Sequence, residues 1–557
     1  MILRKIFTAA FSLLLWTNLI HAQINRPYEP IVLTGDTLSQ FSNYEISRLY
    51  AYTYDATTDT WRRIPFQIDE VDSSAKEEEK YFKPEPDSLS GGILDFDDEI
   101  VFMARDLRDK APTNRWIEHT DSIRYELEFI DPIDESKSYL YLYYSNTTTE
   151  PSPTTTYFMR YEDAVDRIIT ETYEIGFNET GQLSDIMIRN EAGGSGEDIF
   201  DRIKVRLYGL ITFIFPFPVP INENSIIADS AYAKVGPVRI IRNLNAHFYY
   251  DLGILDPFNE PFVQTSFFYP WSSSFSITGI PIDDLQDYAD LLYTRLSWDM
   301  NRNATGMYFY CESNRNGVLV DGSGKKEGIN FKSQNNDFDW TMISGSQGTL
   351  VNIFYVPALG DSQGIFYYDN NDDSLMTNGD PENFQSFLVD TGDSVAYGDS
   401  GYFLYNDIVG EEFNFIYHNY FLPPDINPEI ASQLCNQTRQ PLQCITQTQQ
   451  YVPLTNVSEN ESYPKYKFEL HQNYPNPFNS STVISFSLAE PGNVSLIIYD
   501  LLGKQIKKIV YERLSDGIHK YTWAGDNDQG NSVPTGLYFY KLKVDNRVAT
   551  KKVVLVK

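Results

Sequence analysis

The stretch VSLIIYDLLGKQIKKIVYERL, Val494–Leu514, decides the fold of the C-terminal part of the chain. Apolar and polar residues alternate on both sides of its central turn, which is the pattern of two strands that each bury one face. Before and after this stretch, similar runs alternate with turn sequences such as EPGN, SDG and AGDNDQGN. Together these runs predict a small β-sandwich. They are STVISFSL, VSLIIYD, KQIKKIVYERL, IHKYTW, GLYFYKLKV and VATKKVVLVK.

Longer motifs in this region resemble the C-terminal sorting domain of type IX secretion cargo. The motifs are LHQNYPNPFNSSTVISFSL, TWAGDNDQGNSVPTGLYFYKLKV and the basic end ATKKVVLVK, in this order over about Phe468–Lys557. Gly536, Tyr538 and Tyr540 occupy the family's Gly-x-Tyr-x-Tyr strand, whereas Ser480 stands where many relatives have proline. The resemblance implies export across the outer membrane, usually followed by removal of the domain and surface attachment or release. A carbohydrate-binding or structural Ig-like module is the alternative.

A change in charge marks a domain boundary before this region. Residues 447–463 are polar and poor in large aliphatic side chains, which predicts a linker. Residues 464–557 contain 13 Lys+Arg and 8 Asp+Glu, a net charge of +5, whereas the remainder carries −38 of the total of −33. We therefore predict a basic sorting domain at 464–557 and a large acidic region at 23–446.

The large region is rich in strand signals, including RLYAYTYD, IRYELEFID, SYLYLYYS and TLVNIFYV. The expected fold class is therefore mainly β: a large antiparallel β-sandwich-type region of one or two units, followed by a small Ig-like β-sandwich. One helix is predicted over Ile282–Trp298. It rests on a possible cap at Asp283 or Asp284 and on apolar residues at helical spacing, Leu285, Tyr288, Leu292 and Leu296.

Three segments of the large region have distinctive sequences. They are IPFQIDEVD at Ile64–Asp72, FDDEIVFMARD at Phe96–Asp106 and KVGPVRIIRN at Lys234–Asn243. Together they resemble parts of the supersandwich domains of carbohydrate-active proteins, including polysaccharide lyase-like families, although no catalytic residue can be aligned. The alternative is structural, with Phe66 and Ile68 packing in a strand while Asp69 and Glu70 face solvent or cap a turn.

The N-terminus predicts export. Residues 1–22 combine the basic pair Arg4 and Lys5, an apolar run and the small residue Ala22 at the expected cut, as in a secretory signal peptide. The run is too short for a permanent membrane anchor, and no other stretch is long and apolar enough to span a bilayer. The protein is therefore expected in the periplasm during export, and then outside the cell or on its surface.

Three cysteines bear on this compartment. Cys435 and Cys444 flank a short polar segment that contains proline, and in an oxidising compartment this spacing predicts a small disulfide. Cys311 follows the apolar run MYFY and has no local signature of a nucleophile. It is expected to be a small buried apolar residue.

One acidic segment has the composition of a calcium site. In DNNDDSLMTNGD, oxygen ligands stand at Asp369, Asn371, Asp373 and Asp380, close to the spacing of a calcium loop. Ser374 occupies the position that normally requires glycine, and Asp380 is shorter than the usual bidentate glutamate. Calcium is therefore the one cofactor that the sequence proposes, and a solvated acidic hairpin loop is the alternative.

Signatures of catalysis are absent from the sequence. It has no GxSxG, Walker or zinc-cysteine pattern, and with 77 acidic residues a carboxylate pair is uninformative. His119, His247 and His418 are the histidines left for chemistry in the large region, and none has metal-ligand spacing. The aromatic segment FFYPWSSSF, Phe267–Phe275, is a candidate sugar platform, with core packing as the alternative.

A formal charge of −33 disfavours nucleic acid as a partner. We predict a cargo protein of a type IX secretion system, which engages the secretion machinery through its C-terminal domain. Its β-rich region is expected to bind a glycan or a surface protein. A carbohydrate-active enzyme, either a lyase or a hydrolase, and a structural envelope component are the alternatives.

Overall fold

A computed structural model describes most of the chain from Gln23 to Leu555 and divides it into two compact units, 1–452 and 453–557. Each unit is described by itself. The structure does not describe residues 1–22, 39–40, 42–43, 73–79, 83–91, 118–122, 146–152, 154–155, 212–216, 251–257, 282–289, 324–328, 333–337, 356–362, 371–395, 406–411, 451–468, 472, 474–475, 477, 479–480, 489–490, 500–503, 516, 545–546 and 556–557. The predicted signal peptide therefore lies outside the described residues.

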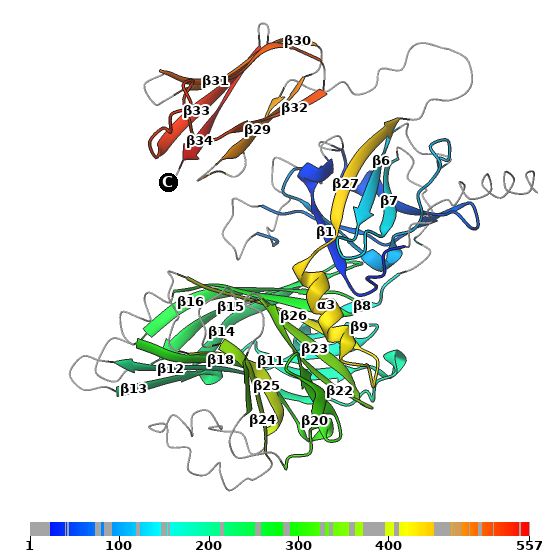
Figure 1. The fold of residues 1–557 in the computed structure, drawn as a ribbon, viewed down its shortest axis with the longest axis vertical. Helices are drawn as coiled ribbons and strands as arrows, with labels where there is room; N and C mark the ends of the chain where they lie inside the picture. Colours follow the sequence, from blue (N-terminus) through cyan, green and yellow to red (C-terminus); the bar gives the residue numbers. More distant parts are fainter. Residues whose placement is uncertain are drawn as a thin grey trace, which may run out of the picture. The chain divides into compact units, whose positions relative to one another are not determined.

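Antiparallel strands dominate both units, so the predicted mainly β class is confirmed. The first unit begins with two small sheets that face each other across a shared core (Figure 1). Leu127, Phe129, Leu140 and Leu142 contribute to this core from one sheet, and Phe102 contributes from the other. The three-stranded sheet has the order β1 (Pro30–Thr34), β5 (Glu99–Met103), β4 (Gln67–Asp69). The five-stranded sheet has the order β27 (Gln443–Gln450), β6 (Ile123–Ile130), β7 (Lys137–Tyr144), β2 (Leu49–Asp55), β3 (Thr60–Arg63).

Three further sheets form the rest of the first unit. The four-stranded sheet has the order β11 (Leu183–Ile188), β10 (Tyr173–Phe177), β9 (Arg167–Thr170), β8 (Met159–Glu162). The six-stranded sheet has the order β13 (Phe217–Asn222), β12 (Phe200–Ile211), β18 (Asp290–Met300), β25 (Ala396–Tyr405), β24 (Gln363–Asn370), β21 (Ile329–Lys332). The nine-stranded sheet has the order β14 (Ile226–Val235), β15 (Ile240–Tyr250), β16 (Phe258–Phe268), β17 (Ser272–Pro281), β26 (Glu412–Leu422), β23 (Gly348–Tyr355), β22 (Phe338–Gly345), β19 (Tyr308–Cys311), β20 (Asn314–Leu319).

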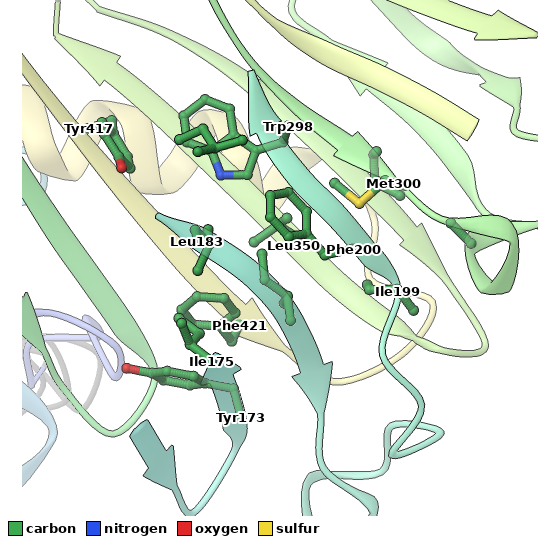
Figure 2. Packing of buried hydrophobic residues seen from close by; sticks show 14 of the residues in the cluster. Tyr173, Ile175, Leu183, Ile199, Phe200, Trp298, Met300, Leu350, Tyr417 and Phe421 are labelled. Atoms are coloured by element: carbon green, nitrogen blue, oxygen red, sulfur yellow. The ribbon is translucent and has the colours of Figure 1, made fainter. Parts of the chain in front are cut away.

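One core joins these three sheets. Trp298 of the six-stranded sheet is fully buried and packs against Phe354 and Tyr417 of the nine-stranded sheet. Tyr173 of the four-stranded sheet stacks on Phe421, with ring centroids 3.9 Å apart (Figure 2). The four-stranded sheet thus completes the same apolar interior.

The only α-helix among the described residues is α3 (Glu429–Arg439). Its residues Ala431, Leu434 and Cys435 pack against Trp340 and Tyr420 on the nine-stranded sheet. These strand residues lie on the face opposite the shared core, because neighbouring side chains on a strand point to opposite faces. The helix therefore covers the second face of the sheet. Among the described residues, no helix is long and apolar enough to span a bilayer.

The helix predicted over Ile282–Trp298 is wrong over its described part. Asp290–Met300 form strand β18, which pairs with β12 and β25. Leu296, Trp298 and Met300 enter the core in alternation, whereas Arg295 and Ser297 point to the other face. The apolar residues at 288, 292 and 296 are four positions apart, a spacing that fits one face of a helix and also every second position on one face of a strand.

The predicted disulfide is also wrong, because Cys311, Cys435 and Cys444 are all free thiols. Cys435 lies on α3 and packs against the nine-stranded sheet. Cys444 lies on β27 and packs in the core between the two small sheets. The chain between them forms the end of a helix and the start of a strand, so the two thiols enter different cores. Cys311 is buried in the large core, as expected.

The second unit is a small sandwich of two antiparallel sheets around Trp523. In Gly536–Val544, Tyr538, Tyr540 and Leu542 are buried while Lys541 and Lys543 are exposed, the alternation expected of a half-buried strand. One sheet has the order β28 (Glu469–Leu470), β29 (Thr482–Leu488), β32 (Gly517–Trp523). The other has the order β31 (Gln505–Leu514), β30 (Gly492–Tyr499), β33 (Gly536–Val544), β34 (Arg547–Leu555).

Candidate functional site

The three distinctive segments of the sequence meet at one buried junction. Arg239, just before β15, forms ion pairs with Asp69 of β4 (Nε to Oδ2, 2.8 Å) and with Glu99 of β5 (Nη2 to Oε2, 2.5 Å). Asp69 is fully buried, so the expectation that it faces solvent is wrong. The segments are separated by up to 170 residues in sequence, but their charges complement one another across the boundary between two sheets.

Gln67 completes this junction. Its Oε1 accepts hydrogen bonds from the backbone N–H groups of Val238 (3.1 Å) and Arg239 (3.0 Å), and its Nε2 donates to Asp69. A side chain at Gly236 would place its Cβ 2.0 Å from Gln67 Oε1, so this position requires glycine. The junction fixes the three-stranded sheet against the nine-stranded sheet, and its polar groups are occupied by protein partners.

The aromatic segment Phe267–Phe275 lies in the interior. Phe268, Tyr269, Trp271 and Phe275 are all buried. The Arg105 guanidinium covers the Trp271 ring, with Cζ 4.0 Å from the ring centroid. The candidate sugar platform is therefore wrong, and the alternative of core packing is confirmed.

A different aromatic surface lies on the outer face of the five-stranded sheet. In LYAYTYD and KSYLYLYY the tyrosines stand at every second position, so Tyr50, Tyr52 and Tyr54 of β2 point to the same side as Tyr139, Tyr141 and Tyr143 of β7. Leucines between them enter the core. We call this surface, together with Trp61 of β3 and Trp116, the tyrosine face. Trp61 and Trp116 are half-buried, whereas the tyrosines of this face are mostly buried: Tyr52, Tyr54, Tyr141 and Tyr143.

The tryptophans pack edge-on against these tyrosines. Trp61 meets Tyr141 with ring centroids 5.0 Å apart, and Trp116 meets Tyr143 at 6.0 Å. The segment carrying Trp116 is attached to the sheet where the Ala111 N–H donates to Tyr141 Oη at 2.7 Å. The tyrosine face is therefore a packed arrangement of rings rather than a set of independent surface residues.

Two glutamates of β6 give this face its hydrogen-bonding groups. Glu126 accepts from Lys110 Nζ (2.9 Å), Gln449 Nε2 (2.9 Å) and Tyr141 Oη (3.1 Å). Glu128 accepts from Lys137 Nζ (2.6 Å) and Tyr139 Oη (3.0 Å). Burial tends to raise the pKa of Glu128, but the bonds from Lys137 and Tyr139 hold this pKa below its usual value.

Arg124 of β6 lies at the centre of the aromatic rings. Its Cζ is 4.4 Å from the ring centroid of Trp116 and 4.9 Å from that of Tyr141. Its Nη1 donates to Tyr143 Oη (2.9 Å), and its Nε donates to Gln449 Oε1 (2.7 Å). Burial raises the pKa of Tyr143 to about 12, even though Arg124 opposes this rise, so the tyrosine stays neutral at physiological pH.

The histidines do not form a catalytic cluster. His247 Nδ1 contacts Asp229 Oδ2 at 3.1 Å across the β14–β15 pair. His418 lies on β26, where burial lowers its pKa to about 4. His119 lies outside the described residues. Within the described part of the chain, no group of three or more His, Cys, Asp or Glu side chains could hold a metal ion.

The predicted calcium ligands are described only in part. Asp369 lies near the end of β24, where its carboxylate accepts from the backbone N–H groups of Asp321 (3.1 Å) and Gly322 (3.0 Å). In the structure this carboxylate thus holds a neighbouring turn. Asn371, Asp373 and Asp380 lie outside the described residues, and the calcium site stays a prediction.

Comparisons with known proteins identify the C-terminal unit. Residues 475–547 match the FlgD Ig-like domain. We call the second unit, residues 453–557, the Ig-like unit. The comparison with curated protein sequences gives no match.

Among solved structures, an α-mannosidase from Enterococcus faecalis V583 is 10% identical with a TM-score of 0.33, over 87% of this chain and 57% of that one. A chondroitinase AC lyase is 8% identical with a TM-score of 0.20, over 70% and 50%. Dimeric latent PorU from Porphyromonas gingivalis is 10% identical with a TM-score of 0.15, over 83% and 36%. The chain thus spans about half the length of the first two and about a third of PorU. At these TM-scores, function has to be argued from the residues.

Sequence reasoning missed the tyrosine face, although its signal is present. Tyrosine at alternate positions in two neighbouring strands indicates a sheet face lined with aromatic rings. The position of Arg124 among these rings depends on which strands pair, and the pairing of β6 with β27 joins segments more than 300 residues apart in sequence. That pairing has no local signal.

Proposed function

We propose that this chain is an exported protein, secreted or held at the cell surface, whose large unit binds glycan through the tyrosine face. The half-buried Trp61 and Trp116, together with the partly exposed carboxylate of Glu128 on the same face, are the observation that carries the proposal. Sugar rings stack on exposed aromatic rings, while neighbouring carboxylates and amides bond their hydroxyl groups. The tyrosine face offers both kinds of group within one sheet.

A glycan array with the full chain tests this proposal. Trp61→Ala should abolish binding, because it removes an aromatic ring that packs on Tyr54, Tyr141 and Tyr143 of the face. The matched control is Tyr308→Ala, which removes a tyrosine that is 42% exposed on the nine-stranded sheet. Equal loss in both variants, or no binding by the wild-type chain, would contradict the proposal. Release of shortened product from a bound glycan would instead favour a carbohydrate-active enzyme.

We also propose that the Ig-like unit directs export by a type IX-like system. Three features support this: the predicted signal peptide at 1–22, the match of 475–547 to an Ig-like domain, and the ordered motifs that resemble sorting domains. Deletion of 453–557 in the native cell should leave the chain in the periplasm, where cell fractionation detects it. The control is deletion of the segment 371–380, which leaves the Ig-like unit intact. Surface display without 453–557 would refute this role.

A further inference from the structure

Six arginines are fully buried in the described part of the large unit, and five of them form an ion pair with a carboxylate. A buried cation is costly unless an anion compensates it, so pairing is the expected arrangement. The five pairs are Arg26 with Asp131 (2.6 Å), Arg206 with Glu223, Arg239 with Asp69 (2.8 Å), Arg242 with Asp166 (Nε to Oδ1, 2.9 Å) and Arg295 with Asp399 (3.4 Å).

Arg124 is the sixth, and within the described residues it pairs with no carboxylate. Its partners are neutral: Tyr143 Oη, Gln449 Oε1 and the carbonyl oxygen of Arg115. Its Nη2 is buried and has no hydrogen-bond partner. The next acidic side chain along the strand, Glu126, is already bonded to Lys110, Gln449 and Tyr141.

The surrounding rings compensate this charge only in part. The rings of Trp61, Trp116, Tyr141 and Tyr143 make cation–π contacts with Arg124, but none of them carries a negative charge or accepts a hydrogen bond from Nη2. Its Nε and Nη1 are occupied, so an anion would bind to Nη2, whose N–H groups can donate a charge-assisted hydrogen bond to a carboxylate or a sulfate. An anion at Nη2 would supply both the missing hydrogen bond and the missing charge.

We infer that Arg124 is a subsite for the anionic group of an acidic saccharide, either the carboxylate of a uronic acid or a sulfate ester. This inference rests on the proposed glycan-binding function and names its ligand class. Arg124 has no exposed surface, and the ring of Trp116 covers its guanidinium. The Trp116 ring must therefore move aside for the anion to reach Nη2, which makes its fluorescence a direct report of binding.

The net charge of the chain makes such binding selective. A formal charge of −33 repels polyanions in general, so an acidic saccharide binds only where a specific cation outweighs that repulsion. The repulsion is screened at physiological ionic strength, where the Debye length is about 8 Å. Measurements therefore belong at about 0.15 M salt.

The experiment titrates the full chain with three probes by calorimetry and tryptophan fluorescence. The probes are a galacturonic acid oligomer, its methyl ester, which is a neutral match of the same length, and a sulfated oligosaccharide. We expect the wild-type chain to bind an anionic probe at least about tenfold more tightly than the ester, because a charge-assisted hydrogen bond contributes about 1.5–3 kcal/mol. The preferred anionic probe distinguishes carboxylate from sulfate.

Arg124→Met should remove this preference, so that the acid and the neutral ester bind with equal affinity. Arg63→Met is the matched control, because Arg63 stacks on Tyr50 of the same face (Cζ to ring centroid, 4.5 Å) and should leave the preference intact. Arg124→Lys keeps a positive charge but loses the Nη2 donor, so it should retain only part of the preference. Trp116→Phe should abolish the fluorescence change while calorimetry still detects binding.

Thermal melting verifies that the variants fold. Arg124→Met should melt at or above the wild-type temperature, because it leaves no unpaired carboxylate behind. If Arg124→Met fails to fold, Arg124→Lys and the wild-type fluorescence titration still decide the question. Equal affinity of the wild-type chain for the acid and the ester, or an undiminished preference in Arg124→Met, would overturn the role of Arg124 alone. Failure of all three probes to bind would count against glycan binding itself.

Discussion

At the scale of single residues, the buried Arg239 shows what a charge pair does when both partners lie in the interior. Replacing it with Met removes the cation from the buried Asp69 and the partly buried Glu99, and leaves Asp69 only the longer ion pair with Lys234 (Nζ to Oδ1, 3.4 Å). We expect Arg239→Met to lower the free energy of unfolding by about 3–5 kcal/mol, which urea denaturation measures. Arg124→Met is the control, because it leaves no carboxylate without its cation. Similar losses in the two variants would contradict this account of the junction.

The residues of this junction could be singled out from sequence, but their roles could not. The segments around Asp69, Glu99 and Arg239 are distinctive. From its local sequence, however, Asp69 is expected to face solvent. Its partner lies 170 residues further along the chain, and only the packing of two sheets brings them together. Burial of a charged residue depends on such a partner, so local sequence does not reveal it.

At the scale of elements, Arg26 ties the N-terminal segment to the end of helix α3. It pairs with Asp131 and also donates to the carbonyl oxygens of Gln437 and Gln440. Burial tends to raise the pKa of Asp131, but the bonds from Arg26 and from the Ile133 N–H hold it below its usual value. Such a carboxylate stabilises the fold above its unfolded-state pKa of about 3.9, and this stabilisation is lost as the pH falls through the folded-state pKa.

The pH dependence of stability tests this link. At pH 7, Asp131→Asn should lower the free energy of unfolding by about 2 kcal/mol. The difference from the wild-type chain should shrink steadily as the pH is lowered below about 4. Asp134→Asn, an exposed aspartate in the same turn, is the control and should show a small difference at every pH. A difference that stays constant down to pH 2 would rule out the Arg26–Asp131 pair as its source.

The free thiols give a second test at the element scale. Because Cys435 and Cys444 enter different cores, the chain unfolded without reductant should titrate as three thiols with a colorimetric thiol reagent. The same chain reduced before unfolding is the control and should give the same number. Detection of a single thiol in the unreduced sample would instead indicate a disulfide between Cys435 and Cys444.

Helix α3 and strand β18 show why local sequence patterns do not always predict the secondary structure of an element. Apolar residues four positions apart fit a helix and a strand equally well, so the spacing before Trp298 did not discriminate between them. The segment EIASQLCNQTR of α3 is largely polar, and the residues that it buries against the sheet, Ala431, Leu434 and Cys435, are few. In both cases the neighbouring sheet decides the conformation through the surface that it buries.

At the scale of the whole molecule, the chain consists of two units that each have a core of their own. We expect deletion of 453–557 to leave the melting transition of the large unit unchanged, because no residue of its core is removed. Differential scanning calorimetry of the full and shortened chains measures this. A lowered transition in the shortened chain would contradict the independence of the units.

Local sequence predicted the fold class of both units. The mainly β class and the strands of the Ig-like unit follow from alternation, which is a local property. The predicted linker at 447–463 follows from polarity, but strand β27 continues to Gln450 because it completes the five-stranded sheet beside β6 (Figure 1). The order of strands in the larger sheets, and with it the tyrosine face, depends on pairings between distant segments, which composition does not specify.

The pairing of β27 with β6 has a consequence for biosynthesis. A ribosome makes β6 early and β27 only after about 300 further residues, so the nascent chain carries an open sheet edge for most of its elongation. Open edges attract other strands, and non-local pairing is slow to form. A truncated product that ends before Gln443 keeps that edge unprotected and becomes a target for chaperones and proteases. The sheet is therefore completed only once the chain has been made through Gln450.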